Sequence, residues 1–237
     1  MLTSLSHDLR TPLASILGAA TTLIVGHDLY DAGQTGELLT TIREEAERLD
    51  RFVGNLLDMS RLEAGVLGAK PEALDVFDLV ETATKRLARR LSTHKIAVDL
   101  PARLSLVRAD PVLLEQAIFN LLDNAAKYSP LGSCIRIHAR TDLDRIFLMI
   151  EDEGSGISPE ALPHIFEKFY RAKASDSRIA GTGLGLAVAR GFVEAFGGRL
   201  DAANRPDKPG AILTISLPIA RNGEVNNGDE TGKNSHR

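Results

Sequence analysis

A histidine and an aspartate stand next to each other near the start of the chain, and a threonine follows one helical turn later. These residues are His7, Asp8 and Thr11 in the run SHDLRTP at positions 6–12. A neutral imidazole nitrogen can attack a phosphoryl group, and a neighbouring carboxylate can hold or remove the proton on the other nitrogen. Pro12 removes a helical hydrogen bond to the carbonyl of Asp8, so we expect a bend here. A surface histidine on a helical bundle would give the same pattern.

Two asparagines and a lysine recur at helical spacing in the middle of the chain. Asn120 and Asn124 are one turn apart on one face, and Lys127 and Tyr128 follow about a turn later. Amide oxygens can ligate a magnesium ion that carries triphosphate, and a lysine can offset phosphate charge directly. Taken alone, the segment also fits a polar, solvated helix face.

An acidic residue followed by spaced glycines comes directly after an apolar run. Asp152 is followed by Gly154 and Gly156. A carboxylate at the end of a strand can accept a hydrogen bond from the exocyclic amine of adenine, and the glycines let the backbone approach the base. The same composition is common in ordinary turns.

A second glycine cluster, GTGLGL at 181–186, opens a helix. Its glycines free backbone amides to point at phosphate, and the helix N-terminus adds partial positive charge. A dinucleotide-binding fingerprint would need a glycine at 186, where a leucine stands, and the Gly-Lys-Ser/Thr of a P-loop is absent. The small, polar segment 172–180 is suited to a mobile lid. The candidate phosphate-binding residues are Gly181, Thr182, Gly183, Leu184 and Gly185.

The elements that position the histidine are two amphipathic helices. Apolar residues at steps of three and four predict one helix up to Val25 and a second over 38–59, joined by a loop at 26–36. Two helices alone bury one face each incompletely, so we expect a homodimer in which two hairpins form a four-helix bundle. Glycines and a proline at 65–71 indicate a hinge.

The rest of the chain predicts mixed α and β structure, which makes the fold class α+β. Asp110 is the expected cap of a long helix. The expected helices are 77–91, 111–128 and 187–196, and the expected strands are 96–100, 104–107, 133–141, 145–152, 199–203 and 211–217. The expected domains are a hairpin at 1–66 and a second domain at 67–220, followed by a disordered tail at 221–237.

Composition narrows the classes of partner. The formal net charge is −4, with acidic and basic residues interspersed, so nucleic acid is not an expected partner. The single cysteine, Cys134, cannot form an internal disulfide, which fits a cytoplasmic fragment. No apolar run approaches about 20 residues, so this fragment is expected to make no membrane contact. The remaining histidines have no ligand spacing, and we expect no structural zinc.

Taken together and in order, these motifs resemble those of sensor histidine kinases of two-component systems. The run at 6–13 is similar to the phosphoacceptor box, and 115–128 is similar to the N-box of the Bergerat-type ATP-binding fold. Asp152 and its glycines resemble the G1 box, 165–171 the F-box and 181–186 the G2 box. The resemblance covers about residues 2–219. It implies a two-layer α/β sandwich that binds ATP and Mg²⁺.

The resemblance also implies roles for the phosphoacceptor box. His7 would be phosphorylated, Asp8 would assist the attack as a base, and Thr11 would orient the water that removes phosphate, making the protein both kinase and phosphatase. The implied acceptor is an aspartate of a response regulator receiver domain. The implied parent is a longer inner-membrane sensor with this part on the cytoplasmic side.

For the nucleotide, the resemblance makes Asn124 the magnesium ligand and Lys127 a phosphate contact. Tyr128 would pack near adenine, and Arg171 would reach the terminal phosphate. Segments 4–20, 120–130 and 204–206 look most like the Kdp-type kinases that govern potassium uptake, which suggests osmotic signalling.

Two other classes share part of this pattern. ATP-hydrolysing proteins of the same superfamily place a glutamate where Asn120 stands, and an amide is a poor base for activating water. A non-catalytic dimerisation or docking module predicts eroded nucleotide motifs, whereas Asn124, Asp152 and the later glycines are all present.

Overall fold

The computed structural model describes residues 2–26, 29–171 and 182–220, including the side chains of all these residues except 2–8. The chain divides into two compact units, Met1–Ser60 and Arg61–Arg237. The expected lid at 172–180 and the expected tail at 221–237 lie outside the described residues.

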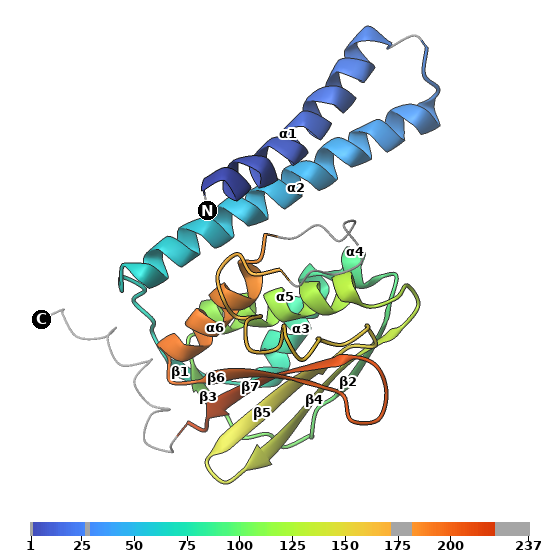
Figure 1. Ribbon diagram of the computed structural model, residues 1–237. Helices are drawn as coiled ribbons and strands as arrows, with labels where there is room; N and C mark the ends of the chain where they lie inside the picture. The colour runs from blue at the N-terminus through green and yellow to red at the C-terminus, as the bar shows by residue number, and fades with distance from the viewer. Residues whose placement is uncertain (1, 27–28, 172–181, 221–237) are drawn as a thin grey trace, which may run out of the picture. The chain divides into compact units, whose positions relative to one another are not determined.

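The first unit is built from two antiparallel helices, α1 (Leu2–Val25) and α2 (Ala32–Glu63) (Figure 1). The helical hairpin is confirmed, but the predicted start of the second helix was wrong, because α2 begins six residues before position 38. The reason is a capping box. The Asp31 side chain accepts a hydrogen bond from the Gln34 N–H at 2.8 Å, and the Gln34 side chain accepts from the Asp31 N–H at 3.2 Å.

Large apolar side chains remain exposed along this hairpin. On α1, Leu13 is 57% exposed and Leu17 is 66% exposed, and on α2 Leu57 is 54% exposed. A helix pair with this much apolar surface in water is incompletely buried, as the sequence predicts.

The second unit contains a five-stranded sheet in the order β2-β4-β5-β7-β6. Its strands are β2 (Lys95–Asp99), β4 (Cys134–Asp142), β5 (Arg145–Glu151), β6 (Arg199–Asn204) and β7 (Ala211–Pro218). The two predicted hairpins are confirmed, since β4 pairs antiparallel with β5 and β6 pairs antiparallel with β7. The parallel pairing of β2 with β4 was not predicted from the sequence.

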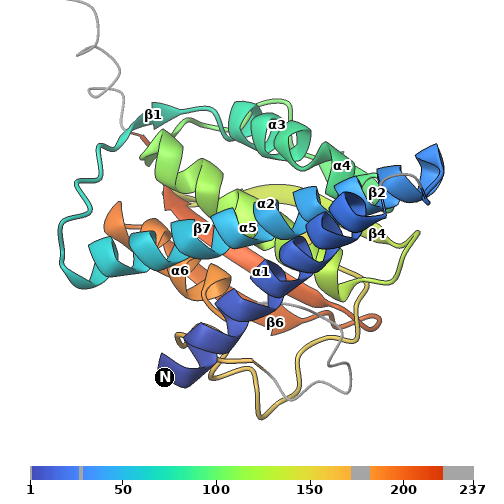
Figure 2. The ribbon, with the colours of Figure 1, turned by 90° about the horizontal axis from the view of Figure 1, so that it is seen from above.

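Helices cover one face of this sheet, and no helix of the described residues covers the other (Figure 1), which makes two layers. The helices are α3 (Val76–Arg86), α4 (Ala88–Leu91), α5 (Pro111–Tyr128) and α6 (Gly185–Ala195). Seen from above, α5 lies between α3 and α6 (Figure 2). The expected α+β class and two-layer architecture are therefore confirmed.

Helix α5 carries the centre of the core. Leu114, Ile118 and Leu121 are fully buried, because the helix packs on the sheet and between its neighbouring helices. The helix begins where the sequence predicts. Asp110 accepts hydrogen bonds from the N–H groups of Val112 and Leu113, both at 3.0 Å.

Two other predicted elements differ from the structure. The helix expected over 77–91 is interrupted at Leu87, between α3 and α4. The strand expected at 104–107 lies at Val107–Ala109, as β3, because its pairing partner is the short strand β1 (Glu72–Leu74), with Leu74 opposite Val107. Strand β1 was not recognised, because three residues carry no periodicity. Helix α6 begins at Gly185, two residues before the predicted start.

Within the described residues, no helix combines the length and the apolar character needed to cross a bilayer.

The Asp110 cap also ties the linker to α5, and this predicts an unusually large effect of removing it. Its second carboxylate oxygen accepts a hydrogen bond from the Lys70 N–H at 2.8 Å, and the residue is 8% exposed. We expect Asp110→Ala to lower the free energy of unfolding by about 2 kcal/mol. The control Asp75→Ala removes the exposed N-cap of α3, whose side chain accepts a hydrogen bond from Phe77. It should lower the free energy of unfolding by only about 0.5–1 kcal/mol. If urea denaturation gives equal losses of unfolding free energy for Asp110→Ala and Asp75→Ala, the hydrogen bond from the linker to Asp110 does not add stability.

Candidate functional site

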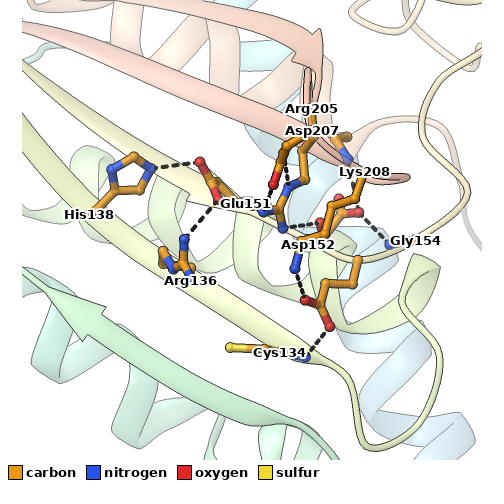
Figure 3. Close-up of polar contacts among 11 residues, drawn as sticks. Cys134, Arg136, His138, Glu151, Asp152, Gly154, Arg205, Asp207 and Lys208 are labelled. Atoms are coloured by element: carbon orange, nitrogen blue, oxygen red, sulfur yellow. Dashed lines mark hydrogen bonds and ion pairs between the residues drawn. The ribbon is translucent and has the colours of Figure 1, made fainter.

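Asp152 lies directly after the end of β5 with its side chain buried. Its Oδ1 accepts hydrogen bonds from the Gly154 N–H at 2.8 Å and from the Ala211 N–H at 3.0 Å (Figure 3). Within the described residues, no hydrogen bond to Oδ2 is found. The carboxylate is therefore oriented through one oxygen, and the other can accept a hydrogen bond from a ligand.

Opposing effects act on the pKa of this carboxyl, and burial is the largest of them. Burial raises the pKa of Asp152 above its ordinary value, and the hydrogen bonds from Ala211 and Gly154 and the charge of Arg205 oppose that rise. A carboxylate in such a place gains from an N–H donor that replaces the lost water. A buried carboxylate with one oxygen available as an acceptor fits recognition of an exocyclic amine.

The two glycine segments both lie beside helix α5. A side chain at Gly154 would lie 2.5 Å from the backbone oxygen of Tyr128, and one at Gly185 would lie 4.0 Å from the side chain of Asn120. Asn120 and Tyr128 are eight positions apart, or about 12 Å along an α-helix. A nucleotide at this site would therefore place its base near the C-terminal end of α5 and its phosphates near Asn120.

Asn120 is an unusual residue for a helix core. It is 7% exposed, and its buried Nδ2 has no hydrogen-bond partner among the described residues. Asn124, one turn later on the same face, is half-buried. A buried amide without a partner costs free energy, so it indicates a group that the site receives from elsewhere.

Lys127 is held by a carboxylate that the sequence analysis passed over. Its Nζ lies 2.6 Å from Asp123 Oδ2, and Arg90 on α4 pairs with the other oxygen of Asp123. Burial would raise the pKa of Asp123, but the charges of Lys127 and Arg90 and their hydrogen bonds outweigh it, so the pKa lies below its ordinary value. Lys127, the predicted phosphate contact, is thus bound to a carboxylate of its own helix and is only partly exposed.

The second glycine cluster is fixed against the segment that resembles the F-box. The Phe169 N–H donates to the Gly183 carbonyl at 3.0 Å. A side chain at Gly183 would lie 2.7 Å from backbone atoms of both Phe169 and Tyr170, and its φ of 69° is in the left-handed region. Phe166, by contrast, packs against the core beneath Arg190, so its role there is packing.

The remaining candidate residues are distributed as follows. The Thr182 hydroxyl accepts a hydrogen bond from the Leu184 N–H at 3.3 Å. Leu184 itself has a fully buried side chain, so only its backbone could contact a ligand. Tyr128 is 49% exposed. Arg171 is exposed, and Gly156 has a φ of 78°.

The phosphoacceptor candidates belong to the other unit. The backbones of His7 and Asp8 are part of α1, but their side chains lie outside the described residues, as does the whole of Gly181. Thr11 lies on α1 and is exposed.

The sequence analysis missed residues on the hairpin of β6 and β7 that contact Asp152 and its loop. Besides Ala211, these are Asn204, which binds the backbone of Ile157, and Arg205. Figure 3 shows Arg205 beside Asp152, to whose carbonyl it donates. Their only signal in the sequence is the segment 204–206, which was noted as a subfamily feature.

Comparison with known families accounts for both units. Residues 1–65 match the family described as His Kinase A (phospho-acceptor) domain, and residues 109–221 match the Histidine kinase-, DNA gyrase B-, and HSP90-like ATPase family. The chain belongs to the sensor histidine kinase family. Its two units are those of the catalytic core of such a kinase, and the second is an ATP-binding domain.

A curated relative is the sensor protein KdpD of Clostridium acetobutylicum. It is 42% identical over 220 residues, which cover 92% of this chain and 24% of the relative. The chain thus spans about a quarter of the length of the curated relatives that it matches first.

Solved structures agree with the fold. The Acinetobacter baumannii histidine kinase AdeS has a TM-score of 0.68 and 29% identity, and the match covers 91% of this chain and 98% of AdeS. Full-length ShkA in complex with AMPPNP has a TM-score of 0.65 and 25% identity, with 92% of this chain and 46% of that chain covered.

The contact of Gly183 with Phe169 and Tyr170 predicts a specific effect on nucleotide binding by the kinase. We expect Gly183→Ala to weaken binding of a fluorescent ATP analogue at least about tenfold, because the left-handed conformation costs about 1–2 kcal/mol and the methyl group displaces the facing backbone. The control Gly132→Ala has a φ of 81° but no atom within 4 Å of the added carbon. It should lose stability and keep its nucleotide affinity. Equal affinities in the two variants would disprove the role of this contact.

Proposed function

We propose that this chain binds ATP with magnesium, phosphorylates its own His7 and passes the phosphoryl group to an aspartate of a response regulator. The observation that carries the proposal is that both glycine segments lie beside one helix, α5, together with the oriented, buried carboxylate of Asp152 and the buried Asn120 amide, which has no hydrogen-bond partner among the described residues. ShkA, a relative of the same architecture, is in complex with AMPPNP, an ATP analogue, which supports the choice of nucleotide.

The residues present suit a magnesium nucleotide. Asn120 has a buried amide nitrogen for which the described residues provide no partner, and Asn124 offers an amide oxygen on the same helix face. When bound, Mg²⁺ offsets triphosphate charge, and Asn124 is the residue that would hold it. Lys127 and Arg171 supply positive charge for the phosphates, and Tyr128 an aromatic surface near the base.

The proposed transfer is a displacement at phosphorus. A neutral imidazole nitrogen of His7 attacks the γ-phosphorus, the bond to the oxygen of ADP breaks, and ADP leaves with the electron pair. Asp8 stabilises or removes the proton on the other nitrogen. The second unit has to bring its nucleotide to α1, and the linker around Gly65, with a φ of 64°, is the proposed hinge.

Direct hydrolysis of ATP is the rival activity. It needs a base that activates water one turn before Asn124, and the residue there is Asn120. An amide has no usable basicity near neutral pH. This supports transfer to an imidazole over transfer to water.

The proposed partners follow from the hairpin and from the relatives. The phospho-acceptor match and the exposed Leu13, Leu17 and Leu57 support a homodimer through a four-helix bundle. We take the domain limits as 1–66 and 67–220, with a tail at 221–237. The KdpD relatives support potassium or osmotic signalling and a longer parent, since this chain covers 24% of the first of them. We place that parent in the inner membrane, with this part on the cytoplasmic side.

Labelling with γ-labelled ATP and magnesium tests the kinase directly. We expect acid-labile, base-stable label on the wild-type chain, because phosphorus on an imidazole is lost in acid. His7→Gln should abolish the label and retain nucleotide binding, whereas Asn124→Ala should lower labelling at least about a hundredfold because magnesium positioning is lost.

The controls separate the alternatives. His164→Gln changes an exposed histidine whose ring hydrogen-bonds Glu167 at 2.7 Å and lies 5.5 Å from the Tyr170 ring, and it should label like the wild type. Phosphate release without protein label would favour the ATPase, and neither release nor label would favour a docking module.

Phosphatase activity is the second proposed function, and it depends on Thr11. With a phosphorylated receiver domain that this kinase has loaded, we expect Thr11→Ala to slow dephosphorylation at least about tenfold and to leave autophosphorylation within about twofold, because only the attacking water loses its orientation. Thr21→Ala, an exposed threonine later on the same helix, is the matched control. An unchanged dephosphorylation rate in Thr11→Ala would eliminate this role.

A further inference from the structure

The turn between β6 and β7 holds the loop that follows Asp152. Asn204, the last residue of β6, binds the backbone of Ile157 in both directions. Its Oδ1 accepts from the Ile157 N–H at 2.7 Å, and its Nδ2 donates to the Ile157 carbonyl at 2.7 Å. A side chain at Gly156 would lie 2.9 Å from Asn204 Oδ1, so this close approach depends on a glycine. The far end of the loop is thereby attached to the sheet.

Arg205 attaches the near end of the same loop. Its side chain is only 5% exposed, which is rare for an arginine and requires partners. The guanidinium donates to the Asp152 carbonyl at 3.3 Å and lies 3.5 Å from the Glu151 carboxylate (Figure 3). Asp207, in the same turn, pairs with it at 3.4 Å.

The hairpin also orients the Asp152 carboxyl itself. Asp152 and Ala211 exchange hydrogen bonds, since the Asp152 N–H donates to the Ala211 carbonyl at 3.0 Å and the Ala211 N–H donates to Asp152 Oδ1 at 3.0 Å. At Gly210, where φ is 139°, an added side chain would collide with the Asp152 carbonyl. The conformation of the loop at 152–157 therefore depends on the β6–β7 hairpin, because this hairpin binds both ends of the loop and the Asp152 carboxyl.

We propose that Asn204 and Arg205 are positioning residues for base selection, which hold Asp152 and the loop 153–157 so that the site accepts adenine and rejects guanine. The inference deepens the proposed ATP-binding function and rests on it. Adenine presents an amine to the carboxylate, whereas guanine presents a carbonyl oxygen at the same ring position. The fixed carboxylate rejects guanine because it cannot turn away.

Asn204 provides the cleaner test, because it is exposed and its replacement does not open the core. With the full chain, we expect Asn204→Ala to raise the KM for ATP about tenfold, since two backbone hydrogen bonds are lost, with kcat within about twofold. The ratio of kcat/KM for ATP over GTP should fall about tenfold. Asn204→Asp keeps the acceptor for the Ile157 N–H and should recover part of both losses.

The control is Lys208→Gln, which lies in the same turn and removes a partly exposed side-chain ion pair with Glu153 at 2.5 Å while keeping the hydrogen bonds to the backbone of the loop. It should leave the ATP/GTP ratio unchanged. A merely structural role of Asn204 would lower activity with both nucleotides equally, and that result, or an unchanged KM for ATP, overturns the inference.

Asp152→Asn distinguishes failure of the inference from failure of the proposed function. If Asp152→Asn abolishes the preference for ATP and Asn204→Ala does not, only the positioning role is wrong. If the wild type shows no preference for ATP, or keeps it in Asp152→Asn, the assignment of Asp152 to adenine is wrong and the inference falls with it.

Discussion

The burial of α5 is the constraint on which the second unit depends. This helix packs against the sheet and the helices α3, α4 and α6, and its apolar residues form the centre of the core. The same helix carries Asn120 and Asn124, so polar groups are fixed by the packing of their apolar neighbours. Burial makes the helix rigid, but it leaves the Asn120 amide nitrogen without a partner within the described structure. A ligand that accepts a hydrogen bond from this nitrogen would bind without requiring the site to reorganise.

Features determined by neighbours in the sequence were predictable. The start of α5 followed from Asp110 and Pro111, because a cap and a first-turn proline act on the residues that follow them. The start of α2 was missed although it is equally local. The capping box of Asp31 and Gln34 lies ahead of the apolar repeat, and two nearby glycines gave the segment a loop composition.

Features that depend on distant pairing were not predictable from one sequence. β1 forms because β3 offers an edge, and β2 joins β4 in parallel across a long connection that includes α5. In the candidate site, Asp152 and its glycines were recognisable from their order, whereas Asn204 lies 47 residues beyond Ile157 in the sequence. Asp123 was missed for another reason. In the sequence it forms an ordinary helical pair with Lys127, and only the structure shows that it is buried and also binds Arg90.

The orientation of Asp152 through backbone groups has a consequence for sequence divergence. Both donors to its carboxylate are main-chain N–H groups, at Gly154 and Ala211. Any residue at position 211 other than proline supplies the same donor, but the Ala211 side chain is only 7% exposed, so the variation there is restricted to small side chains. Positions 154 and 210 have no such freedom, because an added side chain would meet the backbone of Tyr128 or of Asp152. Over evolutionary time the orientation of Asp152 is therefore preserved by the two positions that have no side chain at all.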